Sequence, residues 1–118
     1  MDDGRPIFLQ IAEQLEAQII SGSLREEAQV PSINDLAAFH RINPATALKG
    51  VNLLVDAGIL YKRRGIGMFV ADGARERLIA ARRDAFRAEF VGPLVARAKA
   101  LGISTEQLTR MVGKEAEK

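Results

Sequence analysis

The chain has 118 residues, which suits one domain, or a small domain with an oligomerisation element, and leaves little room for a separate catalytic domain. It is 47% hydrophobic and 27% charged, a globular composition that excludes a disordered tail. The sequence has no cysteine and one histidine, His40, which excludes disulfides, thiolate nucleophiles and clusters of Cys or His around a metal. We therefore expect a folded protein that is not an enzyme and uses no cofactor.

Hydropathy and charge along the chain give two further expectations. No apolar run approaches the roughly 20 residues that cross a bilayer, and the acidic start Met-Asp-Asp-Gly is unlike a signal peptide, so we expect a cytoplasmic protein without membrane contact. The net charge is only +2, but it is unevenly distributed. Between positions 41 and 64 the basic residues are Arg41, Lys49, Lys62, Arg63 and Arg64, against the single acid Asp56. This stretch is a local basic patch.

Two helices are predicted before position 41. The first runs from about residue 6 to 21, where apolar residues recur every four positions. Those residues are Ile7, Ile11, Leu15 and Ile19. Residues 25–30 are expected to form a connecting loop. Ser32, followed three residues later by Asp35, resembles a capping box and predicts a second helix that ends near His40.

A third helix is predicted to begin at Asn43 and Pro44, where Asn caps the helix and Pro occupies its first position. It should end near residue 57, before Gly58. Its inward residues should be Leu48, Val51, Leu54 and Val55. The second and third helices, with their short turn, form a helix-turn-helix pattern whose core the first helix completes.

A β-hairpin is predicted directly after the third helix. Two short apolar strands, residues 59–61 and 68–70, flank a basic turn that contains Gly65 and Gly67. No helix follows these glycines to receive a phosphate, so they do not form a nucleotide-binding loop. The predicted fold is therefore mainly α with a small β-hairpin, with a winged helix-turn-helix domain over residues 1–71.

Residues 72–118 are predicted to form a helical dimerisation segment. A long helical stretch should be kinked or broken at Gly92 and Pro93, because proline lacks a backbone N–H and clashes with the preceding turn. Ser104 and Gln107 should form a capping box for a last helix. The tail from Gly113 is expected to be frayed.

The third helix carries the candidate residues for reading DNA. The second helix of a helix-turn-helix enters the major groove, and helical spacing puts Ala45, Thr46 and Lys49 on one outward face. The methyl groups of Ala45 and Thr46 can touch thymine, and Lys49 can reach a phosphate or a guanine. In an isolated helix, Thr46 is better interpreted as a helix-start residue and Lys49 as a solvated charge. The neighbouring hairpin favours the DNA-binding interpretation.

The hairpin and two nearby residues complete the candidate site. Lys62, Arg63 and Arg64 can enter a minor groove or bind phosphates; alone, they would be a charged edge that prevents aggregation. Ser32 is a cap that also suits a phosphate, whereas His40 is expected to pack locally instead of acting as a proton switch. The candidate DNA-binding residues are Ser32, Asn34, Asn43, Ala45, Thr46, Lys49, Lys62, Arg63, Arg64, Gly65 and Gly67.

The sequence motifs of this chain resemble those of the GntR superfamily of bacterial regulators, and within it those of the small YtrA-like subfamily. The resemblance covers most of residues 6–71, with Pro-Ile-Phe at 6–8, Val-Pro-Ser at 30–32, Asn-Pro at 43–44 with Thr46, and Arg-Arg-Gly at 63–65 with Phe69-Val70. It implies a homodimer on a palindromic operator in double-stranded DNA, usually a repressor, and leaves open a small-molecule effector of unknown identity. The candidate dimer residues are Leu78, Phe86, Phe90, Leu94, Leu101 and Leu108.

Two departures from the family pattern concern DNA binding. Asn34 stands where the family usually has arginine, which removes a charged contact, and Gly50 stands where alanine is common. Asn34 and the modest net charge also favour an alternative, a winged-helix module that binds a protein and has lost specific DNA binding. An enzyme is the third reading, but the sequence shows no nucleophile with a base and no carboxylate pair at a recognisable spacing.

Overall fold

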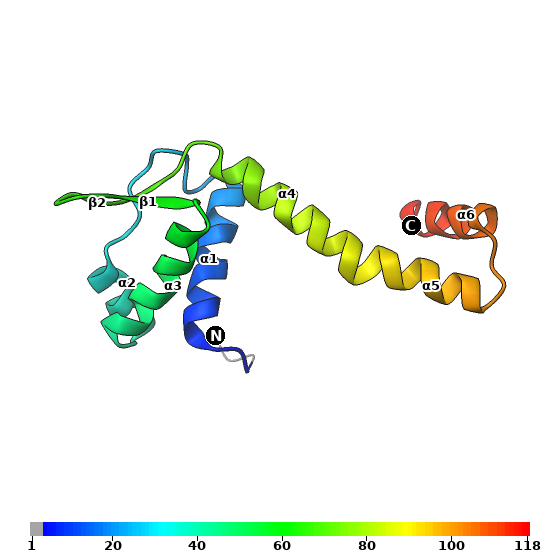
Figure 1. Ribbon diagram of the computed structural model, residues 1–118, viewed down its shortest axis with the longest axis horizontal. Helices are drawn as coiled ribbons and strands as arrows, with labels where there is room; N and C mark the ends of the chain where they lie inside the picture. The colour runs from blue at the N-terminus through cyan, green and yellow to red at the C-terminus, as the bar shows by residue number, and fades with distance from the viewer. Residues whose placement is uncertain (1–3) are drawn as a thin grey trace. The chain divides into compact units, whose positions relative to one another are not determined.

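The computed structural model describes residues 4–118, and the chain divides after Ala80 into two compact units (Figure 1). The first unit runs past the expected boundary at residue 71, because Ala74 and Leu78 are buried in its core. The fold is mainly α with one small hairpin, as predicted. In chain order the elements are α1 (Ile7–Ser21), α2 (Ile33–His40), α3 (Pro44–Asp56), β1 (Leu60–Arg63), β2 (Gly67–Val70), α4 (Ala74–Phe86), the π-helix η1 (Arg87–Val91), α5 (Gly92–Ala100) and α6 (Thr105–Ala116).

The predicted caps of α2 and α3 are present. The Ser32 hydroxyl accepts a hydrogen bond from the backbone N–H of Asp35 at 3.0 Å, and Asn43 Oδ1 accepts one from the N–H of Ala45 at 2.8 Å. Each bond satisfies a donor that the first helical turn leaves without a partner. Together they fix both ends of the short turn between α2 and α3.

The core of the first unit is built from one face of each of its first three helices, from the hairpin and from the start of α4. Ile11, Leu15 and Ile19 of α1 are buried as expected, but Ile7 is exposed, so the buried stripe begins one turn later. The prediction that Leu48 faces inward is wrong, because the buried face of α3 is formed by Ala47, Gly50, Val51 and Leu54.

The wing, which is the hairpin of β1, β2 and the turn between them, has more strand pairing than the sequence indicated. β1 and β2 pair antiparallel, with Tyr61 opposite Phe69. The expected loop at residues 25–30 runs along β2: the N–H of Val30 donates to Met68 O at 2.9 Å, and the N–H of Val70 donates to Ala28 O at 3.0 Å. This segment is a connecting loop, as predicted, and it also supports the hairpin through these backbone hydrogen bonds.

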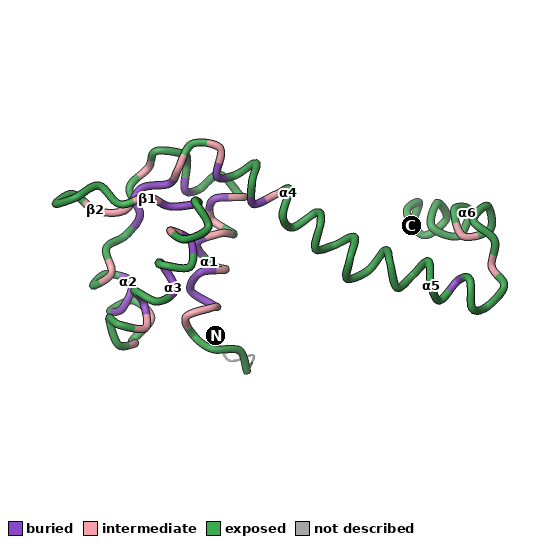
Figure 2. The backbone as a smooth tube through the Cα atoms, in the orientation of Figure 1, coloured by how far each residue is buried: buried purple, intermediate pink, exposed green. Residues whose placement is uncertain are grey.

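The second unit, Ala81–Lys118, consists of helices whose surface is almost entirely exposed (Figure 2). The sequence predicted a kink or a break at Gly92 and Pro93; the helical stretch continues through both residues, but its hydrogen bonding changes just before them. Residues 87–91 form a π turn in which the N–H of Gly92 donates to the carbonyl of Arg87. The wider turn accommodates Pro93, which has no N–H to donate and whose ring would collide with an α-helical carbonyl.

The last helix follows a predicted capping box. The N–H of Gln107 donates to the Ser104 hydroxyl at 3.1 Å, and Gln107 Oε1 accepts from the N–H of Ser104 at 2.9 Å. The helix runs through Gly113 to Ala116, so the expected frayed tail is helical. Within residues 4–118, no helix is both long enough and apolar enough to cross a bilayer.

Candidate nucleic-acid interface

The first turn of α3 exposes part of the predicted recognition surface. Asn43 and Ala45 are exposed, whereas Thr46 is half-buried. The Asn43 side chain is engaged by the N–H of Ala45, so its role as a helix cap is filled within the chain. Ala45 therefore contributes its methyl group to the outward face, and Thr46 lies at the edge of that face.

Lys49 is exposed but lies against α1. Its Nζ atom is 4.1 Å from the centre of the Phe8 ring, a cation–π contact that holds the ammonium group beside the first turns of α1. The next residue, Gly50, also faces Phe8, because a Cβ atom at this position would lie 2.7 Å from the Phe8 carbonyl oxygen. Gly50 thus has a packing reason that the sequence alone did not show: α1 and α3 approach too closely here for a larger residue.

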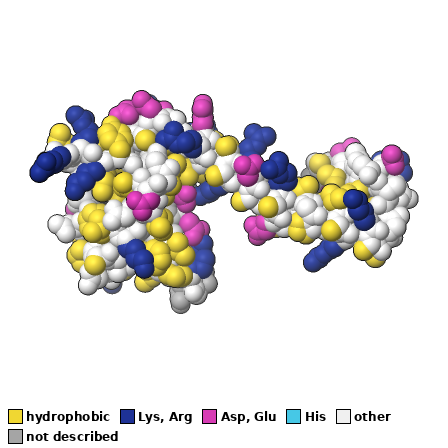
Figure 3. Space-filling view, viewed as in Figure 1, with side chains coloured by type: hydrophobic (Ala, Val, Ile, Leu, Met, Phe, Trp, Pro, Cys, Tyr) yellow, Lys and Arg dark blue, Asp and Glu magenta, His cyan; other side chains and the backbone are white. Residues whose placement is uncertain are grey.

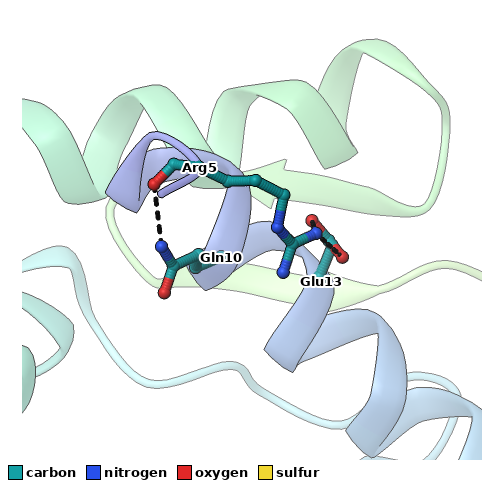
Figure 4. A network of polar contacts seen from close by, with 3 residues as sticks. All are labelled: Arg5, Gln10 and Glu13. Atoms are coloured by element: carbon teal, nitrogen blue, oxygen red, sulfur yellow. Dashed lines mark hydrogen bonds and ion pairs between the residues drawn. The ribbon is translucent and has the colours of Figure 1, made fainter. Parts of the chain in front are cut away.

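Polar contacts fix the start of α1 beside this site (Figure 4). The Arg5 guanidinium forms an ion pair with Glu13, and the Gln10 amide, which is buried, donates to the Arg5 carbonyl at 2.8 Å. These contacts span the residues on either side of Phe8. They therefore tie Arg5, just before α1, to the first half of this helix.

The wing carries its basic residues to the end of the hairpin, where Figure 3 shows Lys and Arg side chains gathered. Lys62 and Arg63 lie in β1, not in the turn as expected, and the Arg63 guanidinium carbon is 5.0 Å from the centre of the Phe69 ring. Arg64, Gly65 and Ile66 form the turn, and Gly65 has a left-handed φ of 76°. Arg64 makes no hydrogen bond or ion pair with any described residue, so its charge is available to a partner.

Gln29, in the loop of residues 25–30 that pairs with β2, holds the turn of the hairpin in place by a hydrogen bond. Its Nε2 donates to the carbonyl of Ile66 at 3.0 Å, and a Cβ atom on Gly67 would lie 2.7 Å from the same nitrogen. Gly67 therefore leaves space for the Gln29 side chain. This is a packing role within the protein, whereas the sequence had suggested contact with DNA. Sequence patterns carry no signal for this contact, because Gln29 is 37 residues from Ile66.

Acidic residues gather at the other end of the hairpin, where it meets α4. The Tyr61 hydroxyl donates to Glu27, and this hydrogen bond raises the pKa of Tyr61 above its ordinary value. A hydrogen bond with Glu27, together with its negative charge, raises the pKa of Asp72. Glu26 accepts a hydrogen bond from the N–H of Gly73 at 3.0 Å. This negative cluster disfavours phosphates at the base of the wing, in contrast to its tip.

The remaining predicted residues of α2 lie at its two ends. Ser32 and Asn34 are exposed near its start, and Ser32 acts as the cap. His40 is half-buried and makes an edge contact with the Phe39 ring, with the centroids 5.0 Å apart. Phe39 itself is 77% exposed and was not singled out from the sequence, because it falls outside the apolar spacing of α2.

The predicted dimer residues fall into two groups. Leu78 is buried in the core of the first unit, so its side chain is already covered within one chain and we no longer place it at an interface. The others lie in the second unit and are exposed, apart from half-buried Leu108. The exposed members are Phe86, Phe90, Leu94 and Leu101.

Three helices around a common core, followed by a hairpin with an arginine tip, define a winged helix-turn-helix protein. Among residues 4–118 no cluster of His, Asp or Glu side chains could hold a metal ion. Residues 8–70 match the sequence profile of the gntR family of bacterial regulatory proteins, which is more than half of the chain. The chain belongs to this family.

Relatives and solved structures extend the match. The chain is 29% identical to the uncharacterised HTH-type transcriptional regulator YhcF of Bacillus subtilis over 88% of this chain and 84% of that protein. It is 27% identical to the HTH-type transcriptional repressor YtrA of the same organism, over 87% and 78%. A GntR-family regulator from Bacteroides thetaiotaomicron has the same fold, with a TM-score of 0.78 and 32% identity over 94% of this chain and 96% of that one.

A DNA complex is also among the similar structures. The DNA-binding domain of AraR, solved with its operator ORX1, matches with a TM-score of 0.56 and 28% identity over 60% of this chain and 86% of that one. The matches to the family, to its repressors and to a DNA-bound domain agree with the fold and the basic wing. The protein is a DNA-binding transcription regulator.

Proposed function

We propose that the protein is a homodimeric repressor that binds a palindromic operator. In each subunit α3 lies in the major groove, and the wing binds phosphates or the adjacent minor groove. The observation that carries the proposal is the free arginine at the tip of a braced hairpin, beside a helix capped at its exposed start. The similarity to YtrA, which is named a repressor, supports the sign of regulation.

The exposed apolar side chains of the second unit support the homodimer. Phe86 and Phe90 are 58% and 55% exposed, and their ring centres lie 5.4 Å apart on one face of the helix. Large apolar groups on one helix face are stabilised by burial against a partner. A second copy of the same helices provides a complementary partner, since a twofold interface uses one surface twice. Two half-sites are then about 34 Å apart, or a multiple of this distance.

Selection of bound duplexes from a random pool tests the proposal. We expect enrichment of a palindromic sequence, which the protein binds much more tightly than random duplex. Affinity should fall steeply with salt, because phosphate contacts release counterions. The substitution Arg64→Ala should weaken binding to every duplex and reduce the slope of log affinity against log salt by about one for each subunit.

The matched control for this test is Arg110→Ala. Arg110 is an exposed arginine of α6, outside the proposed DNA surface, and its removal should leave the salt slope unchanged. A pool without any enriched sequence, or an Arg64→Ala slope equal to that of the wild type, would contradict the proposal. The first result would instead favour a winged-helix module that binds another protein.

A further inference from the structure

The exposed face of α3 is apolar at its N-terminal half. Ala45 is exposed, and Leu48 is 41% exposed although its residue type and the spacing of α3 predicted burial. A half-exposed leucine at the fifth position of the helix is in the region from which recognition helices contact base edges. It has no hydrogen-bonding group, so it cannot read a polar base edge.

Contacts with α1 define which way Leu48 faces. Lys49 and Gly50 both lie against Phe8, so these two positions mark the side of α3 that faces α1. Successive residues of an α-helix are about 100° apart, which turns Leu48 away from Phe8 and places it about 60° from Ala45. Leu48 therefore lies on the part of the exposed surface that is directed away from α1, and Ala45, about 40° from Lys49, lies between these two residues on that surface.

Two exposed polar residues flank Leu48: Lys49, the next residue, and Asn52, one helical turn later in the second half of α3. The Lys49 ammonium is held over the Phe8 ring, on the α1 side of the helix. A cationic side chain in that position suits a phosphate at the rim of a groove better than a base edge at its floor. The N-terminal half of α3 therefore presents methyl groups toward the groove.

We infer that Leu48 is a specificity-determining residue that contacts the 5-methyl group of a thymine in each half-site, with Ala45 beside it. This inference rests on the proposed function and adds the identity of the base. Thymine is the base that carries an apolar group in the major groove. Any other base at that position would place a polar edge against Leu48 and leave it without a hydrogen-bond partner.

The test removes only the methyl group. Each thymine of the selected operator is replaced in turn by deoxyuridine, symmetrically in both half-sites, and the affinity is measured for the wild type and for Leu48→Ala. We expect one thymine position at which the wild type loses about fourfold per half-site, as burial of one methyl group predicts. The Leu48→Ala protein should bind the thymine and deoxyuridine duplexes with nearly equal affinity.

Leu53→Ala is the matched control, because Leu53 is on the same helix and 39% exposed, but lies four residues after Lys49 on the α1 side. It should keep the wild-type ratio between the two duplexes. Equal wild-type affinity at every position, or a full methyl effect in Leu48→Ala, would overturn the inference while leaving the proposed function intact. A pool without an enriched duplex would overturn both. Thermal melting shows that each variant is folded.

Discussion

The two units of the chain use their apolar residues in opposite ways. The first buries side chains from α1, α2, α3, the hairpin and the start of α4 in one core. In residues 81–118, all of which the structure describes, Ala98 is the one buried residue. The first unit therefore has the contacts that stabilise a fold within a single chain. The second unit has few such contacts of its own.

The largest difference between the two units is expected in the double variant Phe86→Ala and Phe90→Ala, which should weaken the dimer without unfolding the first unit. If these rings pack between subunits, each truncation should weaken the dimer by about 2 kcal/mol, or roughly thirtyfold in its dissociation constant. Sedimentation velocity should show a shift from dimer to monomer at low micromolar concentration. The core of the first unit contains neither ring, so its helical signal should persist.

Phe39→Ala is the control for this double variant. Phe39 is a more exposed aromatic residue, at 77%, but it belongs to the first unit. Its removal should leave the dimer unchanged. A wild-type protein that sediments as a monomer, or a double variant that remains a full dimer, would show that the exposed rings have another purpose.

A smaller effect, confined to the first unit, is expected from Gly50→Ala. The new Cβ atom would lie 2.7 Å from the Phe8 carbonyl oxygen, which belongs to the backbone and cannot move away easily. Overpacking of this kind costs about 1–3 kcal/mol, more than the 0.5–1 kcal/mol that alanine gains over glycine inside a helix. Urea unfolding should show a less stable protein.

Gly113→Ala makes the same chemical change in the second unit. No atom lies within 4 Å of a Cβ built at Gly113, so only the gain in helix propensity remains. We expect this variant to be slightly more stable than the wild type. If both variants changed stability in the same direction, close packing of α1 on α3 would not be the reason for Gly50.

The smallest effect is expected from Asp72→Asn. Glu27 raises the pKa of Asp72, so the folded protein holds this proton more tightly than the unfolded chain, and stability falls as the pH rises through the folded pKa. Asparagine removes the repulsion. The melting temperature at neutral pH should therefore rise modestly, and the difference should shrink as the pH falls through the raised pKa of Asp72 and this carboxyl group takes up its proton. Asp84→Asn, beside Arg87 in the second unit, should not show this gain.

The features that the sequence predicted correctly are local ones. The caps at Ser32, Asn43 and Ser104 were predicted because each depends on a side chain and a backbone N–H two or three residues away. The order of helices and strands followed from apolar spacing and from Gly and Pro positions in the same way. These signals were sufficient for the winged helix-turn-helix class.

The errors came from contacts between distant residues. Leu48 was placed inward because the sequence does not show that Gly50 and Ala47 allow α1 and the core to approach the other side of α3. The orientation of Lys49 depends on Phe8, and the bracing of the wing depends on Gln29. Helical periodicity carries no information about such partners. The exposed face of α3 could therefore be assigned only from the structure.

The π turn at residues 87–91 has a consequence for how this helix can vary among related proteins. Inserting one residue into an α-helix normally rotates everything after it by about 100°, which would move the later side chains off their face. A π turn absorbs one additional residue locally. Relatives without a proline at the position of Pro93 are therefore expected to align with a gap of one residue here while still presenting the same face.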